Sequence, residues 1–271
     1  MQLLFLRIIL GIITLYSNDS KNTQPSENNI ILTSININSE EANSPLGTNP
    51  NFEIDYLLGK FDPATHPDFA KIPLEVTNKE NVYLRKEVLE AFVNMRNAAR
   101  KEGVSLKIIS ATRNFQAQKG IWEAKWNGNR LVEGENLSVS IKNPAQRAIK
   151  ILRYSSMPGT SRHHWGTDID INDLTDSYFL SGKGKKEYEW LVKNAGKYGF
   201  CQVYSPKGEQ RPQGYEEEKW HWSYIPTSEI LLQQYQAKVK PEDIKGFQGA
   251  ETAQSINVIQ NYVLGINSDL R

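Results

Sequence analysis

Three of the four histidines in this sequence fall in two short clusters that also carry carboxylates. The clusters occupy residues 161–170 and 218–222, and their histidines and acids are His163, His164, Asp168, Asp170, Glu218 and His221. Neutral imidazole and carboxylate are ordinary zinc ligands, and a catalytic zinc commonly has three protein ligands and one water. The sequence therefore predicts a metal site that draws on both clusters.

His163, Asp170 and His221 would make such a three-ligand set. Glu218 would then lie near the metal without binding it, and it could take a proton from the bound water as that water attacks a carbonyl. Zinc lowers the pKa of its water from about 15.7 towards about 7, so a nearby carboxylate is a sufficient base at neutral pH. The pattern predicts hydrolysis at a carbonyl carbon.

Short strands are expected to position these side chains. Polar and apolar residues alternate over 166–171 and 220–225, which is typical of half-buried strands. On the first strand, Asp168 and Asp170 would face one side while the isoleucines that alternate with them pack into the core. The two acids would then lie on the face that carries the site.

The sequence pattern of the rest of the domain predicts helices and one more strand. We predict helices over 84–102, 115–126 and 185–198, another that begins at Pro144 with Asn143 as its N-cap, and a short strand over 106–110. Helices and strands do not alternate regularly enough for a doubly wound sheet. We therefore expect an α+β fold with helices packed around a small antiparallel sheet.

Three segments resemble the motifs of one known family. Residues 161–170 (SRHHWGTDID) and 218–221 (EKWH) resemble the S-x-H-x-x-G-x-A-x-D and E-x-W-H motifs of zinc D-alanyl-D-alanine carboxypeptidases of the VanY type, peptidase family M15. Residues 110–118 (SATRNFQAQ) are similar to the family's S-G-Y-R-S-x-x-x-Q segment. The resemblance implies the D-Ala-D-Ala carboxypeptidase/hedgehog-like zinc peptidase fold and hydrolysis of peptide bonds in peptidoglycan stem peptides.

The resemblance also implies roles for individual residues. It gives the ligand set and base named above, with Zn²⁺ as the cofactor. Arg113 matches the family arginine that stabilises the oxyanion or polarises the substrate carbonyl, and Ser161 and Gln118 match substrate-contacting positions. The sequence departs from the family where Asp168 replaces Ala and where Ala-Thr at 111–112 replaces Gly-Tyr, which leaves the shape of the substrate cleft open.

Asp168 has three competing interpretations. It could accept a hydrogen bond from a metal-bound imidazole, form a salt bridge with Arg162 or Arg113, or be an exposed carboxylate without a role. A carboxylate beside the ligand set adds charge that needs compensation, which favours the first two.

Several functions are compatible with these motifs. We expect a D,D-carboxypeptidase that acts at or near the D-alanine end of stem peptides, and the alternatives are an L,D-carboxypeptidase or an endopeptidase on peptidoglycan. A serine hydrolase built from Ser161, His163 and an aspartate is a further alternative. A non-catalytic zinc-containing cell-wall-binding domain is the last, although such a domain needs neither Glu218 nor Arg113.

Composition and the N-terminal region suggest where the protein acts. Lys and Arg number 32 against 31 Asp and Glu, a balance that argues against nucleic acid as a partner, and the single cysteine excludes a disulfide scaffold. Residues 1–16 are mostly apolar and predict a signal peptide or N-terminal membrane anchor, 17–50 a disordered polar linker, and 51–271 the zinc peptidase domain. We expect export to the periplasm or cell envelope, peptidoglycan stem peptides as substrates, and no other protein partner.

Overall fold

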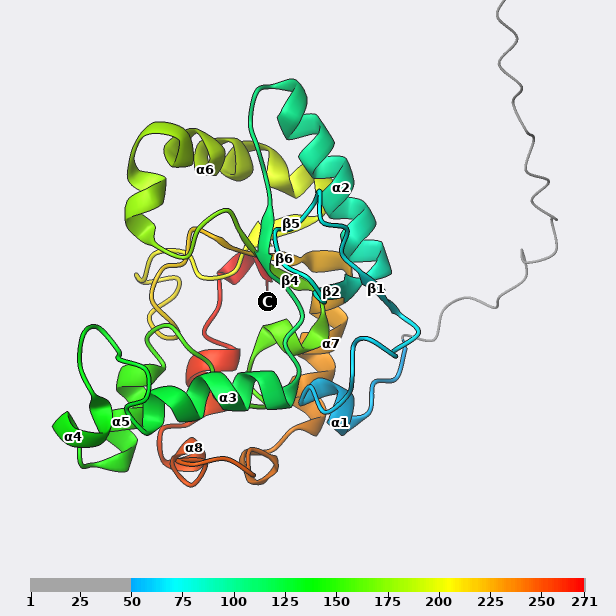
Figure 1. Ribbon diagram of the computed structural model, residues 1–271. Coiled ribbons are helices and arrows are strands. Elements are labelled where there is room, and N and C mark those ends of the chain that lie inside the picture. Colours follow the sequence, from blue (N-terminus) through cyan, green and yellow to red (C-terminus); the bar gives the residue numbers. More distant parts are fainter. Residues whose placement is uncertain (1–49, 271) are drawn as a thin grey trace, which may run out of the picture. The chain divides into compact units, whose positions relative to one another are not determined.

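A computed structural model describes residues 50–270, which belong to one structural unit, Thr48–Arg271 (Figure 1). The predicted signal segment, 1–16, and all but the last residue of the predicted linker, 17–50, lie outside the described residues. Both therefore stay predictions. Within the described part of the chain, no helix is long and apolar enough to cross a membrane.

The centre of the fold is a four-stranded antiparallel sheet in the order β3-β4-β6-β5. Its strands are β3 (Ile108–Ser110), β4 (Asp168–Ile171), β5 (Phe200–Gln202) and β6 (His221–Tyr224). A separate hairpin pairs β1 (Phe69–Lys71) with β2 (Tyr83–Arg85). The small antiparallel sheet and the α+β class predicted from the sequence are confirmed.

The helices that surround the sheet largely follow the sequence pattern. They are α1 (Ile54–Leu57), α2 (Lys86–Lys101), α3 (Phe115–Trp126), α4 (Leu137–Ser140), α5 (Pro144–Ile151), α6 (Gly182–Asn194), α7 (Ile225–Lys238) and α8 (Thr252–Ser255). The bounds of α3 agree with the prediction. Helix α5 begins at Pro144 because the Asn143 side chain accepts a hydrogen bond from the backbone N–H of Gln146 at 3.0 Å.

Two predicted helices have different ends in the structure. The predicted helix over 84–102 begins only at Lys86, because Leu84 and Arg85 pair with β1 as part of β2. The predicted helix over 185–198 begins earlier, at Gly182, and its last four residues form a 3₁₀ turn that ends at Gly199 with φ of 81°. In the first case tertiary strand pairing overrides local helix propensity.

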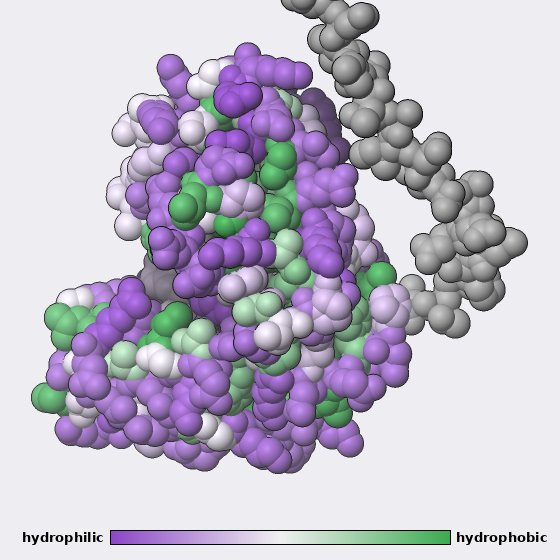
Figure 2. All heavy atoms as spheres, turned by 45° about the vertical axis from the view of Figure 1, so that its right-hand side comes forward, coloured by the Kyte–Doolittle hydropathy of each residue, from purple (hydrophilic) through white to green (hydrophobic). Residues whose placement is uncertain are grey.

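Two hydrophobic clusters flank the sheet. One packs α2 and α6 against strand residues that include Ile169 and Ile171, which confirms the predicted inward face of β4. The other packs α3, α5 and α7 together around residues such as Trp122 and Leu231. In Figure 1, α2 and α6 lie above the sheet and α3, α5 and α8 below it. Figure 2 shows a recess between these upper and lower parts of the molecule.

Candidate active site

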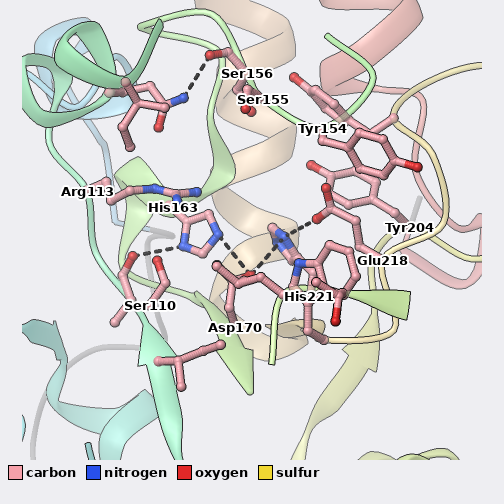
Figure 3. Close-up of a pocket in the computed structure, with 18 of the residues that line it drawn as sticks. Ser110, Arg113, Tyr154, Ser155, Ser156, His163, Asp170, Tyr204, Glu218 and His221 are labelled. Carbon is pink, nitrogen blue, oxygen red and sulfur yellow. Dashed lines mark hydrogen bonds and ion pairs between the residues drawn. The ribbon is translucent and has the colours of Figure 1, made fainter. Parts of the chain in front are cut away.

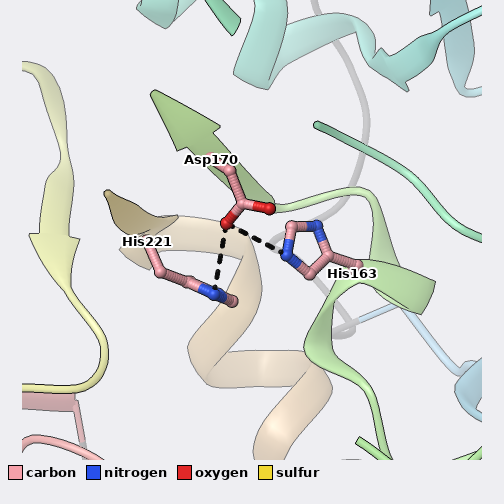
Figure 4. Close-up of side chains that lie close together, drawn as sticks. All are labelled: His163, Asp170 and His221. Carbon is pink, nitrogen blue, oxygen red and sulfur yellow. Dashed lines mark ion pairs between the residues drawn. The ribbon is translucent and has the colours of Figure 1, made fainter. Parts of the chain in front are cut away.

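His163, Asp170 and His221 meet at the centre of the sheet (Figure 4). Asp170 on β4 lies directly opposite His221 on β6, so the two side chains share one face. His163 comes from a 3₁₀ turn, Arg162–Trp165, that precedes β4. Asp170 Oδ1 lies 3.4 Å from His163 Nε2 and 3.5 Å from His221 Nδ1. The structure thus brings together the three residues predicted as ligands.

The atoms of this triad fit a metal cation. His163 Nε2 and Asp170 Oδ1 are buried and have no hydrogen-bond partner among the described residues. Leaving such atoms unpaired costs about 1–3 kcal/mol or more each, which a bound cation would offset. Two imidazole nitrogens and one carboxylate oxygen, all within 4.8 Å of one another, form a typical three-ligand donor set.

The remaining ring nitrogen of each histidine is held by an oxygen acceptor. His163 Nδ1 lies 2.8 Å from the carbonyl oxygen of Ala111, and His221 Nε2 lies 2.9 Å from Asp168 Oδ2. A carbonyl oxygen only accepts, so His163 Nδ1 carries the proton and Nε2 keeps its lone pair for a metal. Such partners orient metal-binding imidazoles and set their tautomers.

The surrounding carboxylates favour positive charge at His221. Burial alone would lower the pKa of His221, but hydrogen bonds to Asp168 and Glu218 and the charge of Asp170 raise it to about 9. A metal cation at Nδ1 would meet the same demand for positive charge as a proton does. The electrostatics therefore agree with the unpaired donor atoms.

Glu218 lies beside the triad. Its Oε2 atom is 3.1 Å from His221 Nδ1, the nitrogen that faces Asp170. Burial raises the pKa of the Glu218 carboxyl, and the negative charge of Asp170 adds to the increase, while His221 and Arg113 oppose it. A carboxylate whose pKa is shifted towards neutrality suits proton transfer near neutral pH.

Arg113 reaches the site from the segment that follows β3. Its backbone N–H donates to the carbonyl oxygen of His163 at 3.1 Å. Figure 3 shows its side chain extending over His163 into the pocket, and its buried Nε atom has no hydrogen-bond partner among the described residues. The guanidinium is thus available to a substrate oxygen.

His164, for which the sequence analysis predicts no role, holds the backbone of Arg113 in position. Its Nδ1 atom lies 2.6 Å from the Arg113 carbonyl oxygen, and its Nε2 atom accepts a hydrogen bond of 3.0 Å from the backbone N–H of Gly159. Burial lowers the pKa of His164 to about 3, so the ring is neutral. Gly59 packs so closely that a Cβ there would lie 2.4 Å from His164 Nδ1. His164 is a structural residue.

The two residues predicted to contact substrate differ in position. Gln118 lines the cleft, which has a volume of about 680 Å³; its Nε2 donates to the Ser156 carbonyl oxygen at 2.8 Å, and its Oε1 has no partner among the described residues. Ser161 is buried and is not among the lining residues. Its Oγ makes no hydrogen bond with either nitrogen of His163, so the alternative of a serine hydrolase lacks its nucleophile–base pair.

Asp168 is fully buried, and each of its two carboxylate oxygens contacts charged or polar groups. Its Oδ2 atom pairs with Arg162 Nε at 2.9 Å and with His221 at the same distance, and its Oδ1 atom accepts from Ser223 Oγ at 2.6 Å. Burial alone would raise the pKa of Asp168, but Arg162 and His221 hold it well below its ordinary value. The imidazole contact and the Arg162 salt bridge are both present, and the exposed interpretation is wrong.

Sequence reasoning missed several residues that line the cleft, notably Lys125, Ser155, Tyr204 and Tyr215. For Lys125 a signal was available, since it lies seven residues after Gln118 on a correctly predicted helix. Two helical turns bring those positions to one face. The other three come from segments between helices and strands, which carry no such periodicity.

Comparisons with known proteins bear on the family of this chain. The model of the family described as VanY, D-alanyl-D-alanine carboxypeptidase, matches residues 81–227. The candidate carboxypeptidase YodJ of Bacillus subtilis (strain 168) is 28% identical over 197 residues, 68% of this chain and 64% of that protein. A D-alanyl-D-alanine carboxypeptidase of Enterococcus faecalis is 26% identical over 151 residues, 56% of this chain and 51% of that protein. The chain thus spans less than two thirds of the length of these relatives.

A solved structure, that of the LdcB LD-carboxypeptidase, is also similar, with a TM-score of 0.48 and 23% identity over 72% of this chain and 80% of that chain. The match to the family model covers more than half of the present sequence, and it includes both histidine clusters and the segment that carries Arg113. This chain therefore belongs to the VanY family of D-alanyl-D-alanine carboxypeptidases.

Proposed function

We propose that this protein is a zinc-dependent peptidase that removes the terminal D-alanine from peptidoglycan stem peptides, that is, a D,D-carboxypeptidase. The observation that carries the proposal is the buried triad of His163, Asp170 and His221, with Glu218 beside it and Arg113 extending over it. A site that only bound metal would need neither of the last two residues. Membership of the VanY family supports the same reaction.

Zinc is the proposed cofactor because two imidazoles and one carboxylate match the ligand set of catalytic zinc sites. When bound, zinc would polarise the scissile carbonyl and make water acidic enough to deprotonate near neutral pH. His163 and His221 would bind it through Nε2 and Nδ1, the nitrogens that face Asp170.

Two other residues carry the proposed chemistry. Glu218 would accept the proton of the attacking water on its buried carboxylate and return it to the leaving amine. Arg113 would donate from its guanidinium to the carbonyl oxygen, where negative charge develops as the water adds. His164 would keep Arg113 in place through its hydrogen bond to the Arg113 carbonyl oxygen.

The proposed place of action is the periplasm or cell envelope. The support is the apolar character of residues 1–16, which predicts an export signal or an anchor. The proposed substrate is consistent with that location, because peptidoglycan lies outside the cytoplasmic membrane.

Mass spectrometry of defined muropeptides tests the bond specificity. The purified, zinc-loaded protein is incubated with a pentapeptide that ends in D-Ala-D-Ala, a tetrapeptide that ends in a single D-Ala, and a cross-linked dimer. We expect the pentapeptide to lose one alanine, and a Glu218→Gln variant to leave it intact. Cleavage of the tetrapeptide alone would indicate an L,D-carboxypeptidase, cleavage of the dimer alone an endopeptidase, and no cleavage at all would reject the proposal.

A further inference from the structure

Four cationic side chains line the cleft, and none of them has an ion-pair partner in the part of the chain that the structure describes. They are Lys79, Arg113, Lys125 and Arg130. The contrast with Lys119, on the same helix as Lys125 but outside the cleft, is direct: its Nζ lies 3.8 Å from Glu123 Oε1 and donates to the carbonyl oxygen of Gly246 at 2.7 Å. The cations of the cleft are left free to meet a ligand.

Lys125 lies on the face of α3 that lines the cleft. It follows Gln118 by seven residues, which places it about 10 Å further along the helix axis. Its Nζ donates to the hydroxyl oxygen of Ser155. The next segment turns back on α3, since the backbone N–H of Arg130 donates to the carbonyl oxygen of Ala124 at 2.8 Å. Lys125 and Arg130 thus lie together at the C-terminal end of α3.

The charge of the site is not balanced by its own acids. A zinc ion with Asp170 and Glu218 would be neutral as a group, and Asp176, the other acid that lines the cleft, lies 3.6 Å from Lys219 Nζ. The proposed role of Arg113 places it at the scissile carbonyl. Lys125 and Arg130 then remain without an ion-pair partner among the described residues, and they line the same cleft as the triad.

The environment of Lys125 makes an anion favourable there. The side chain is half-buried, and burial together with the charges of Arg130 and Arg113 lowers its pKa to about 8, although the charge of Glu218 opposes the shift. A cation that is partly desolvated beside two others is destabilised until an opposite charge arrives. A carboxylate that accepts from such a cation forms a charge-assisted hydrogen bond, which is stronger than a neutral one.

We propose that Lys125 and Arg130 form a subsite for a carboxylate of the substrate, so that the cleft prefers an acidic stem peptide to the same peptide with that carboxylate amidated. The inference rests on the proposed function and deepens it by naming the recognition element. Two carboxylates of a stem peptide have the required chemistry: the one at the C-terminus and one on a side chain, such as that of a diaminopimelate residue.

Matched peptides test the subsite. The full-length, zinc-loaded protein is assayed with a pentapeptide that contains diaminopimelate and ends in D-Ala-D-Ala, and with two derivatives, one amidated at the side-chain carboxylate and one at the C-terminus. In the wild type we expect amidation at the recognised position to raise KM about tenfold or more. In Lys125→Met that penalty should shrink to less than about twofold, and Lys125→Arg should restore it. Arg130→Gln should reduce it.

The control is Lys119→Met, which removes a lysine from the same helix outside the cleft and should keep the wild-type penalty. Loss of the penalty in Lys125→Met at the side chain or at the C-terminus identifies which carboxylate is bound, and either result supports the subsite. An unchanged penalty at both positions overturns it, while cleavage of the peptides still supports the proposed function. If the wild type cleaves none of the peptides, the proposed function itself has failed.

Binding of the product peptide gives a second readout that does not depend on turnover. The Kd of the tetrapeptide product is measured by calorimetry for the wild type and Lys125→Met, both with zinc. Tighter binding to the wild type by about tenfold is expected, whereas equal values overturn the subsite. Thermal unfolding of both proteins checks that the substitution leaves the fold intact.

Discussion

Asp168 Oδ2 lies 2.9 Å from His221 Nε2, on the side of the imidazole away from the proposed metal position. The same oxygen lies 2.9 Å from Arg162 Nε, and the side chains of Arg162 and Asp168 are at most 1% exposed. The motif that this segment resembles has alanine at the position of Asp168. This chain therefore carries an additional carboxylate that orients one histidine and neutralises a buried arginine.

This arrangement predicts that substitutions of Asp170 and of Asp168 change the zinc affinity of the protein by different amounts. Asp170→Asn should abolish tight zinc binding because it weakens the only carboxylate of the triad. Asp168→Asn should retain the metal with a loss of about 10–100-fold in affinity, because only the orientation and basicity of His221 change. Competition with a chelator of known affinity measures both. An empty site in Asp168→Asn together with a filled one in Asp170→Asn would show that Asp168 is the metal ligand and that Asp170 is not.

The Arg162–Asp168 pair predicts a large, non-additive effect on stability. Asp168→Ala should lower the free energy of unfolding by about 3–5 kcal/mol, because it leaves the guanidinium of Arg162 buried without its counter-charge. The double variant with Arg162→Met should lose less than the sum of the two single changes. Urea unfolding of the metal-free proteins separates this effect from metal binding. Additive losses would show that the pair does not act as a unit.

The position of Arg113 over the triad predicts that its substitution lowers turnover while the protein keeps its metal. Arg113→Ala should lower kcat by about 100-fold or more, as removal of a donor to a developing oxyanion does. Arg113→Lys should recover only part of this, because a point charge does not reproduce the planar guanidinium. Steady-state kinetics on the D-Ala-D-Ala pentapeptide, with zinc content as the control, measure the effect. Wild-type kinetics in both variants would remove Arg113 from the mechanism.

The lowered pKa of Lys125 predicts that substrate binding weakens above neutral pH. Burial, with Arg130 and Arg113, lowers its pKa to about 8, below that of a free lysine. The side chain is cationic below this pH and loses its charge as the pH rises through it, so attraction for a carboxylate is present below about pH 8 and lost above. KM of the wild type should rise between about pH 7 and pH 9, and KM of Lys125→Arg should change less, since arginine stays charged. Equal pH profiles would contradict the prediction.

The sequence predicts the centre of the site well because its signals are local. Alternation places Asp168 and Asp170 on one face of β4, and the cross-strand register then puts Asp170 opposite His221. Helix α3 begins at Phe115 because the side chain of Asn114 accepts a hydrogen bond from the backbone N–H of Ala117 and caps the helix. The alternation and the helix cap depend only on neighbouring residues, whereas the register joins two strands that are distant in the sequence.

What the sequence does not predict depends on contacts between distant segments. The helix predicted from residue 84 loses its first two residues to the pairing of β2 with β1, a contact that local propensity does not reveal. The close packing of Gly59 against His164 and the lack of an ion-pair partner for Lys125 among the described residues likewise become visible only in the three-dimensional structure. Asp168 shows the same limit. The sequence left a metal-bound imidazole, Arg162 and Arg113 open as its partners, and the structure shows His221 and Arg162.

The central claim is that His163, Asp170 and His221 bind zinc while Glu218 performs proton transfer without binding it. Elemental analysis of purified variants, paired with the pentapeptide assay, tests it most directly. We expect His163→Ala and His221→Ala to lose zinc and activity together, and Glu218→Ala to keep about one zinc per chain while its activity falls by orders of magnitude. Loss of zinc from Glu218→Ala would make this residue a ligand and contradict the account.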